Sequence, residues 1–155
     1  MKTRDRIPPM NSVRRSVLGA IALVLLKPWS AFAAVWNKDA FGAKTAADAL
    51  KSLGTPAAAP SSDVVIDAPE IAENGAVVPI EITSKVPGTT SIVVLIEKNP
   101  FPLLGKFDFM EGALPFVKVN VKMGETSDVR VIAQAGGKSY VATKEVKVTI
   151  GGCGG

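Results

Sequence analysis

The sequence predicts an all-β fold: an immunoglobulin-like antiparallel β-sandwich with an N-terminal helix and a flexible C-terminal arm. Short runs rich in β-branched residues follow one another from residue 62 to residue 150, and turn signals such as Pro87-Gly88 and Gly136-Gly137 separate them. Helical periodicity is nearly absent from the same region. About seven short strands at this spacing are typical of a β-sandwich.

Residues 1–33 have the three regions of an export signal. Arg14 and Arg15 precede an apolar run over residues 17–26, and a small-residue segment ends at Ala33, after which we expect cleavage. The run is too short to span a bilayer, which needs about 20 residues. The paired arginines resemble a twin-arginine signal, which carries folded proteins, and the alternative is an ordinary secretory signal with two chance arginines. We therefore expect the protein in the periplasm.

Removal of this signal changes the charge of the chain. The full sequence has 18 basic and 14 acidic residues, and six of the basic residues and one of the acidic residues lie in residues 1–33. The mature chain keeps 12 basic and 13 acidic residues and is close to neutral. The basic balance of the full sequence is thus no evidence for binding to nucleic acid or to a membrane surface.

Residues 34–61 are predicted to form one amphipathic helix and a linker. Phe41, Leu50 and Leu53 recur among alanines, and Gly54 is typical of a helix end. The segment 55–62 carries two prolines and no bulky apolar residue, which is the composition of a linker. The sandwich domain is therefore expected over residues 62–150.

The strands of this domain are predicted from β-branched runs between turn signals. They cover residues 64–66, 77–82, 92–96, 106–109, 117–121, 129–133 and 140–150. In the last strand Val146, Val148 and Ile150 alternate with polar residues, so we expect these three side chains to face the core.

Two apolar segments leave alternatives open. Residues 92–96 are apolar on both faces, so they form either a central strand covered on both sides or a strand whose outer face meets another protein. An apolar loop consists of Phe101, Pro102, Leu103, Leu104 and Phe107. We expect it to contact a partner subunit, and closure of the sandwich end is the alternative.

The last five residues place the only cysteine of the chain, Cys153, between two pairs of glycines, Gly151 and Gly152 before it and Gly154 and Gly155 after it. Glycine moves freely in φ/ψ space, so residues 151–155 are predicted to form a mobile arm. A single cysteine in an oxidising compartment has no partner within its chain. It stays free, pairs with another chain, or carries a group.

The chain contains no histidine, which limits the chemistry that it can perform alone. Cys-His and Ser-His-Asp catalysis are excluded, and one cysteine without histidine makes no zinc or copper site. We therefore expect no catalytic residue, no metal site and no cofactor. A lipid anchor on Cys153 is excluded as well, because the cysteine of a lipoprotein directly follows its signal.

Several motifs together carry a family resemblance. The terminal Gly-Gly-Cys-Gly-Gly is the most specific of them, and the others are residues 73–80, Asn99-Pro100, residues 123–130 and residues 144–150. Together they resemble the SoxY family of sulfur-oxidation carrier proteins. The resemblance implies that Cys153 is the covalent attachment point for thiosulfate-derived sulfur and that the glycines give the arm clearance inside a partner enzyme.

The resemblance also implies the partners. They are a SoxZ-like β-sandwich subunit in a heterodimer, and, transiently, a SoxAX-like haem protein, a SoxB-like hydrolase and a SoxCD-like sulfur dehydrogenase. The chain itself would be a non-catalytic carrier. The alternative from the residues alone is a structural or adhesive β-sandwich protein in which Cys153 forms an interchain disulfide.

Overall fold

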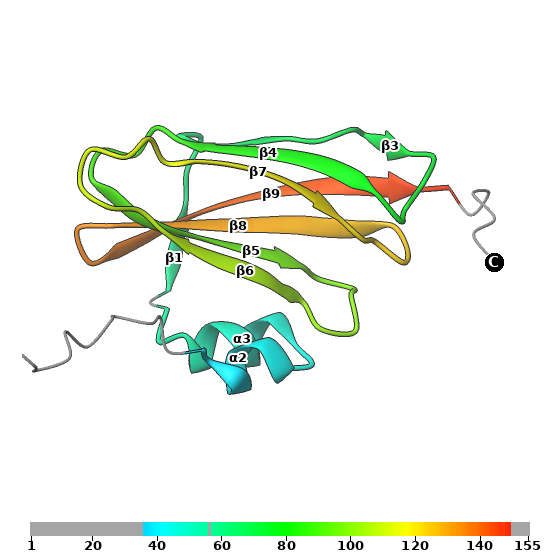
Figure 1. Ribbon diagram of the computed structural model, residues 1–155, viewed down its shortest axis with the longest axis horizontal. Coiled ribbons are helices and arrows are strands. Elements are labelled where there is room, and N and C mark those ends of the chain that lie inside the picture. The colour runs from blue at the N-terminus through cyan, green and yellow to red at the C-terminus, as the bar shows by residue number, and fades with distance from the viewer. Residues whose placement is uncertain (1–35, 56, 150–155) are drawn as a thin grey trace, which may run out of the picture. The chain divides into compact units, whose positions relative to one another are not determined.

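The computed structural model describes residues 36–55 and 57–149, and every structural statement below concerns these residues. Figure 1 shows short helices followed by strands along the chain. The elements are α2 (Lys38–Gly42), α3 (Ala46–Ser52), β1 (Ala58–Pro60), β2 (Val64–Asp67), β3 (Ile71–Ala72), β4 (Val78–Ser84), β5 (Thr89–Ile96), β6 (Leu103–Asp108), β7 (Phe116–Val121), β8 (Ser127–Ala135) and β9 (Lys138–Val148).

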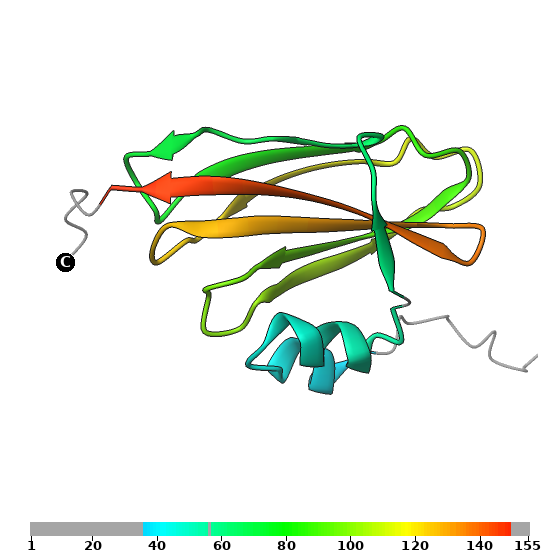
Figure 2. The ribbon, with the colours of Figure 1, turned by 180° about the vertical axis from the view of Figure 1, so that it is seen from behind.

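The strands form a larger and a smaller sheet packed face to face. The larger sheet has the order β1-β9-β8-β5-β6, with β3 also paired to β9, and the smaller sheet has the order β2-β4-β7. Most neighbours are antiparallel, but β1 and β3 join β9 in parallel. The predicted immunoglobulin-like β-sandwich is confirmed. Figures 1 and 2 show the helices on the outer face of the larger sheet.

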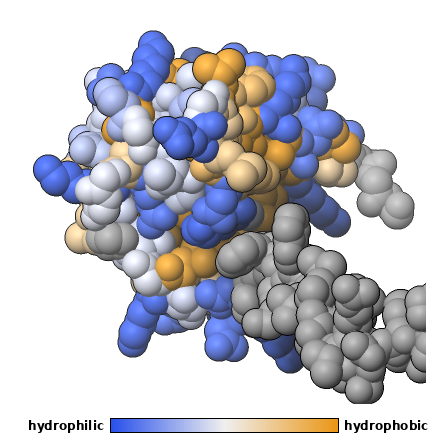
Figure 3. Space-filling model, turned by 60° about the vertical axis from the view of Figure 1, so that its left-hand side comes forward, coloured by the Kyte–Doolittle hydropathy of each residue, from blue (hydrophilic) through white to orange (hydrophobic). Residues whose placement is uncertain are grey.

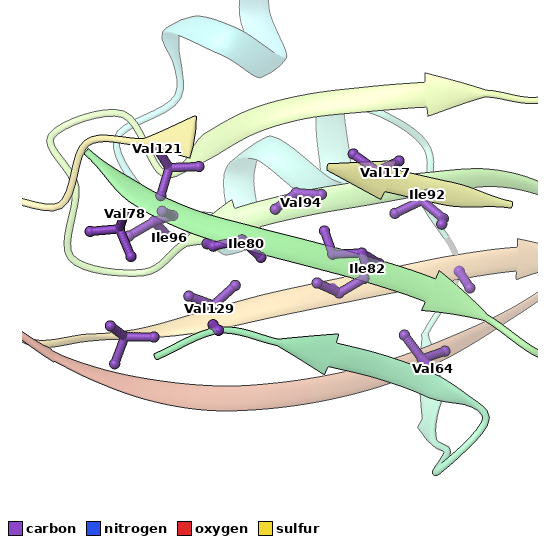
Figure 4. Close-up of a cluster of buried hydrophobic side chains, with 14 of the residues drawn as sticks. Val64, Val78, Ile80, Ile82, Ile92, Val94, Ile96, Val117, Val121 and Val129 are labelled. Carbon is purple, nitrogen blue, oxygen red and sulfur yellow. The ribbon is translucent and has the colours of Figure 1, made fainter. Parts of the chain in front are cut away.

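The main core lies between the two sheets. In β4 buried side chains alternate with exposed or half-buried ones, so Ile80 and Ile82 point inward with no exposed surface. Ile92 and Val94 of β5 and Val129 of β8 meet them from the larger sheet. Figure 4 shows these branched side chains interdigitating between the strands.

A second core lies between the larger sheet and the helices. Val93 and Leu95 of β5 point away from the main core and pack with Ile132, Ala40 and Ala49. The segment 92–96 is therefore a central strand covered on both faces, and the alternative of a partner-facing strand is wrong for this segment. Its outer cover is the chain's own N-terminal part.

The N-terminal segment differs from the prediction of one helix and a linker. Ala43 has extended backbone angles and ends α2, and the Thr45 hydroxyl accepts a hydrogen bond from the Asp48 N–H at 3.1 Å, which caps a separate helix, α3. The expected linker contains β1, which pairs with β9. The segment therefore packs as part of the sandwich unit rather than outside it.

Every predicted strand is present, with shifted bounds, whereas β1 and β3 were missed. Both are very short and pair in parallel with β9, so they carry no alternation that a sequence pattern could reveal. In β9 Val146 is buried and Val148 packs against the main core, as expected. Ile150 lies outside the described residues.

The expectation that the apolar loop contacts a partner is wrong for most of its residues. Leu103 packs in the second core, and Leu104 and Phe107 pack against the main core, so this segment closes the sandwich. Phe101 remains half exposed, and the Lys44 ammonium lies 3.6 Å from the centre of its ring. This cation–π contact joins the connection between the helices to the β5–β6 loop.

Truncation of Leu95 tests whether the helices belong to the folded unit. Leu95→Ala should lower the free energy of unfolding by about 2–5 kcal/mol, because it leaves a cavity between the helices and the sheet. Urea unfolding measures the effect, and limited proteolysis should cut residues 37–55 faster. Met110→Ala is the control, since Met110 is 85% exposed and its loss should change stability by less than about 0.5 kcal/mol. Equal stability of the two variants would contradict the second core.

Candidate functional site: the root of the C-terminal segment

The described part of the chain ends at Thr149, two residues before the predicted arm of residues 151–155. Cys153 and Gly151, Gly152, Gly154 and Gly155 lie outside the described residues. Arg14, Arg15 and Ala33 of the predicted signal lie outside them too. The geometry that bears on the site is therefore the geometry of its root, at the end of β9.

The last residues of β9 continue beyond their pairing with β8. That pairing ends where Ser127 lies opposite Val146. The N–H of Lys147 then donates to the carbonyl oxygen of Glu70 at 3.0 Å, and the N–H of Thr149 donates to that of Ala72 at 3.1 Å. Strand β3 and the residue before it thus hold one edge of the final segment.

The opposite edge of this segment is held by a side chain. The N–H of Val148 points away from β3, because successive N–H groups of a strand point to opposite edges. It donates to the Thr126 hydroxyl at 3.0 Å. Each of the three consecutive N–H groups of residues 147–149 therefore has a partner after the β8 ladder has ended.

Gly75 brings the loop before β4 against this segment. Its carbonyl oxygen accepts the N–H of Met123 at 2.7 Å. A Cβ at position 75 would overlap the Met123 carbonyl oxygen and would lie 2.8 Å from Cγ1 of Val148, closer than Cβ contacts in proteins. Gly75 does not have a positive φ, so lack of space, rather than backbone conformation, requires glycine here. We call Glu70, Ala72, Gly75 and Thr126 the arm-root clamp.

Other hydrogen bonds tie the loops at this end together. The Asn99 amide donates to the Lys122 carbonyl oxygen at 2.8 Å, and the Lys98 N–H donates to the Ser127 hydroxyl at 3.0 Å. Nearby, Arg130 and Glu97 form an ion pair at 2.9 Å. Figure 1 shows the β3–β4, β5–β6 and β7–β8 connections at the end of the sandwich where β9 finishes.

The motifs that carried the family resemblance meet at this end. Residues 73–80, the Asn99-Pro100 turn, residues 123–130 and the described part of 144–150 supply the clamp residues Gly75 and Thr126, the joined loops and the final segment of β9. The sequence showed them as separate stretches. The fold shows that they build one structure around the point where the C-terminal segment leaves.

Sequence reasoning missed the clamp. The sequence Asn74-Gly75 is typical of a turn, and Asn74 does form one, since its side chain accepts the N–H of Ala76 at 2.9 Å. Nothing in a sequence distinguishes a glycine that a turn needs from one that a neighbouring strand needs. β3 cannot be predicted from the sequence either, because a strand of two residues has no recognisable pattern.

The charges around the root are of both signs. Lys98, Lys122 and Lys147 are exposed there, and so are Glu73 and Glu125. Within the described residues no group of His, Cys, Asp or Glu side chains is placed to hold a metal ion, and no helix is long and apolar enough to cross a membrane. The described root therefore offers a mechanical support of mixed charge.

Exposed apolar side chains gather on another surface, on the smaller sheet. Val65 lies opposite Thr83, and Thr83 lies opposite Phe116, so Val65 and Phe116 share the outer face. They are 36% and 47% exposed, and Leu114, just before β7, is 84% exposed. We call Val65, Leu114 and Phe116 the β7 patch. Figure 3 shows apolar side chains exposed among charged ones where the end opposite the root comes forward.

An ion pair lies beside this patch. The Lys118 ammonium is 2.6 Å from a carboxylate oxygen of Glu81. The hydrogen bond that the Lys118 ammonium donates to Glu81, together with the negative charge of Glu81, raises the pKa of Lys118 above the ordinary value of 10.5. Lys118 therefore stays protonated at neutral pH, and its charge is matched by that of Glu81.

The fold and the site define an immunoglobulin-like domain that holds its last strand firmly up to the point where a cysteine-containing end follows. The family model described as sulfur oxidation protein SoxY matches residues 49–153. The chain belongs to the SoxY family and has its sulfur-carrier role. The resemblance inferred from the motifs is thus confirmed, and the match runs to the cysteine itself.

A solved structure of a SoxY protein agrees with this assignment, and a second solved structure shares the fold. The sulfur carrier protein SoxY from Chlorobium limicola f thiosulfatophilum is 39% identical, with a TM-score of 0.62, and the match covers 67% of this chain and 96% of that one. A superoxide reductase (neelaredoxin) from Ignicoccus hospitalis is 21% identical, with a TM-score of 0.51, over 59% of this chain and 83% of that one. The second likeness shows the fold alone. The comparison with curated proteins gives no match.

Proposed function

We propose that this protein is a periplasmic carrier that holds thiosulfate-derived sulfur intermediates covalently on Cys153 and presents them to the enzymes of sulfur oxidation. The observation that carries the proposal is the position of the only cysteine, four residues after a strand that is bonded up to Thr149. Four residues extend at most about 13–14 Å. A thiol on such a tether can enter the active site of another protein while the sandwich stays outside.

The chemistry of loading needs a partner. Coupling of the Cys153 thiol to the outer sulfur of thiosulfate forms one S–S bond and releases one proton and two electrons, so an electron acceptor is required. The SoxAX-like haem protein would supply that acceptor. A SoxB-like hydrolase would then add water and release sulfate, and a SoxCD-like dehydrogenase would oxidise the sulfur that remains on Cys153.

The carrier would be non-catalytic. An ordinary cysteine has a pKa of about 8.5, so only a few per cent is thiolate at neutral pH. The chain has no histidine. The basic residue nearest to Cys153 in sequence is Lys147, which is exposed and lies six residues before the cysteine, at the start of the hydrogen-bonded segment 147–149. The thiol would therefore be activated in the pocket of the partner enzyme, and a group such as a bound metal or a histidine would come from that partner.

Export would follow the signal in residues 1–33, with Arg14 and Arg15 directing the twin-arginine route and cleavage after Ala33. That route accepts folded proteins, so the sandwich could form in the cytoplasm and take a bound subunit with it. The periplasm then keeps a lone thiol in an oxidising compartment, where a mixed S–S linkage is stable.

The permanent partner would be a SoxZ-like β-sandwich subunit, and the β7 patch is the surface we propose for it. Within the described residues β7 pairs with β4 alone, so its other edge has unpaired backbone groups that a strand of another sandwich can extend. Phe116 begins β7, whereas Val121 at its other end lies near the root. A subunit bound around Phe116 would leave the end with Cys153 accessible.

Replacement of the cysteine tests the carrier function. After growth on thiosulfate, the intact mass of the mature protein should show sulfur-containing adducts that a reductant removes, and Cys153→Ser should show none. Thiosulfate oxidation in a reconstituted system should fall to background with the variant, while its thermal unfolding midpoint stays unchanged. A covalent homodimer as the sole species, without any adduct, would favour the structural alternative.

Replacement of the arginine pair tests export. With Lys at both Arg14 and Arg15, mature protein in the periplasm should fall at least about tenfold, because the twin-arginine route depends on the pair. Immunoblots of fractionated cells measure it, with Lys2→Arg as a control that keeps the charge. An unchanged amount of periplasmic protein would favour the ordinary secretory signal.

A charge in the β7 patch tests the subunit interface. Phe116→Glu should weaken association with the partner subunit by at least about tenfold, since a carboxylate in an apolar contact loses its hydration. Titration calorimetry measures the dissociation constant. Met110→Glu is the matched control, because Met110 is exposed but lies outside the patch. Equal binding by both variants would place the interface elsewhere.

A further inference from the structure

We propose that the arm-root clamp is a positioning device: it fixes the point from which the C-terminal arm starts and thereby sets the reach and direction of Cys153. The contacts that form the clamp all lie within the described residues. The effect of the clamp on catalysis by partner enzymes rests on the proposed function.

The clamp moves the last held residue of the described chain closer in sequence to Cys153. Pairing with β8 ends at Val146, and without other contacts the segment from residue 147 onward would leave the sheet. The hydrogen bonds of residues 147–149 move the last fixed point to Thr149. The tether to Cys153 is then four residues rather than seven, so its maximum reach is about 13–14 Å instead of about 23–25 Å.

The clamp also sets direction, because it holds the segment from both edges. Glu70 and Ala72 accept the N–H groups of residues 147 and 149 on one side, and Thr126 accepts that of Val148 on the other. A strand held along one edge pivots about that edge, whereas one held along both keeps its axis. The half-buried side chain of Val148 adds a third contact, since it packs against the main core.

Gly75 makes this arrangement sensitive to a single methyl group. The added Cβ would press on the Met123 carbonyl and on Val148. Met123 is 2% exposed and belongs to the main core, so it has little room to move. The end of β9 is held by fewer contacts and is the part that yields. Alanine at position 75 should therefore release residues 147–149.

Release of residues 147–149 should slow the loading of Cys153 by partner enzymes in the proposed carrier. The effective concentration of a tethered group falls roughly as the −3/2 power of tether length. Lengthening from four to seven residues predicts a loss of about twofold, and loss of direction adds to it. A small reagent that meets Cys153 in solution would be unaffected, because its reaction does not depend on where the arm starts.

Gly75→Ala and Gly124→Ala form a matched pair for the test. Both glycines lie at the same end of the sandwich and neither has a positive φ, but a Cβ at Gly124 would meet nothing within 4 Å. Amide hydrogen exchange of Val148 and Thr149 should become at least about tenfold faster in Gly75→Ala and stay unchanged in Gly124→Ala. Equal exchange in both variants would overturn the clamp.

A second pair of variants tests the clamp independently, in case Gly75→Ala misfolds. Thr126→Val keeps the shape of the side chain but removes the acceptor of the Val148 N–H, and it should also speed exchange there. Thr90→Val is its control, because the Thr90 hydroxyl donates to the Gln134 carbonyl at 3.2 Å, away from the root. Faster exchange at Val148 in the control alone, or in neither variant, would count against the proposal.

A distance measurement between two spin labels reports the position of Cys153 directly. Spin labels on Cys153 and on a cysteine introduced at the exposed Lys138 span β9 and the arm. The distance distribution should broaden with Gly75→Ala and Thr126→Val, relative to the two controls, while the rate of Cys153 alkylation by iodoacetamide stays the same. An unchanged width would overturn the inference.

Loading by partner enzymes separates this inference from the proposed function. The kcat/KM for enzymatic loading should fall at least about twofold in the two clamp variants and not in their controls. The distance distribution is measured without cargo, so a broadened distribution with no adduct on Cys153 in any protein would refute the carrier function and leave the clamp standing. Normal adducts on Cys153 with unchanged distance distributions would support the carrier function and refute the clamp.

Discussion

Hydrogen bonding along both edges of β9 is the constraint on which the rest of this structure depends. β8 pairs with β9 from Lys138 to Val146, and on the other edge β1 and β3 pair with its beginning and its end. A strand bonded on both sides opens only if both sets of bonds break, so its local unfolding is more costly than that of an edge strand. β9 is thus held on both edges at its beginning and at its end, and the N-terminal segment contributes by supplying β1.

The same segment explains why the larger sheet has two cores. Side chains of β5 alternate between the sandwich interior, at Ile92 and Val94, and the helices, at Val93 and Leu95. Without α2 and α3 the second set would face water, and a continuous apolar strand would be exposed. The helices are too short to be stable alone and gain their stability from this packing. Strand and helices therefore depend on each other, and the outer face of β5 is closed to partners.

The sequence could predict what local patterns encode. Alternation and turn residues identified the strands that span the sandwich, and the terminal motif identified the family and its sulfur-carrier role. Burial of residues 92–96 on both faces could not be distinguished from an exposed interface, because both give an unbroken apolar run. β3 and Gly75 were missed because their roles depend on residues about 70 positions away, Lys147 and Val148. The root of the site is a tertiary property, whereas the thiol at its end is a property of the sequence alone.

A carrier must keep its thiol close to the domain and must also let the thiol enter a partner's pocket. A firmly held strand end serves the first requirement, and a short glycine-flanked segment serves the second. A long free chain would dilute the thiol around the domain, and a thiol on the rigid sheet could not enter a narrow pocket. Hydrogen bonds up to Thr149 and a cysteine four residues later give the proposed carrier a short connection between the sheet and its thiol. The likeness to a superoxide reductase at 21% identity shows that the sandwich serves other proteins too, so function is not a property of the fold. In the proposed carrier it would depend on the cysteine and on where β9 ends, which the proposed clamp contacts of Gly75 and Thr126 would set.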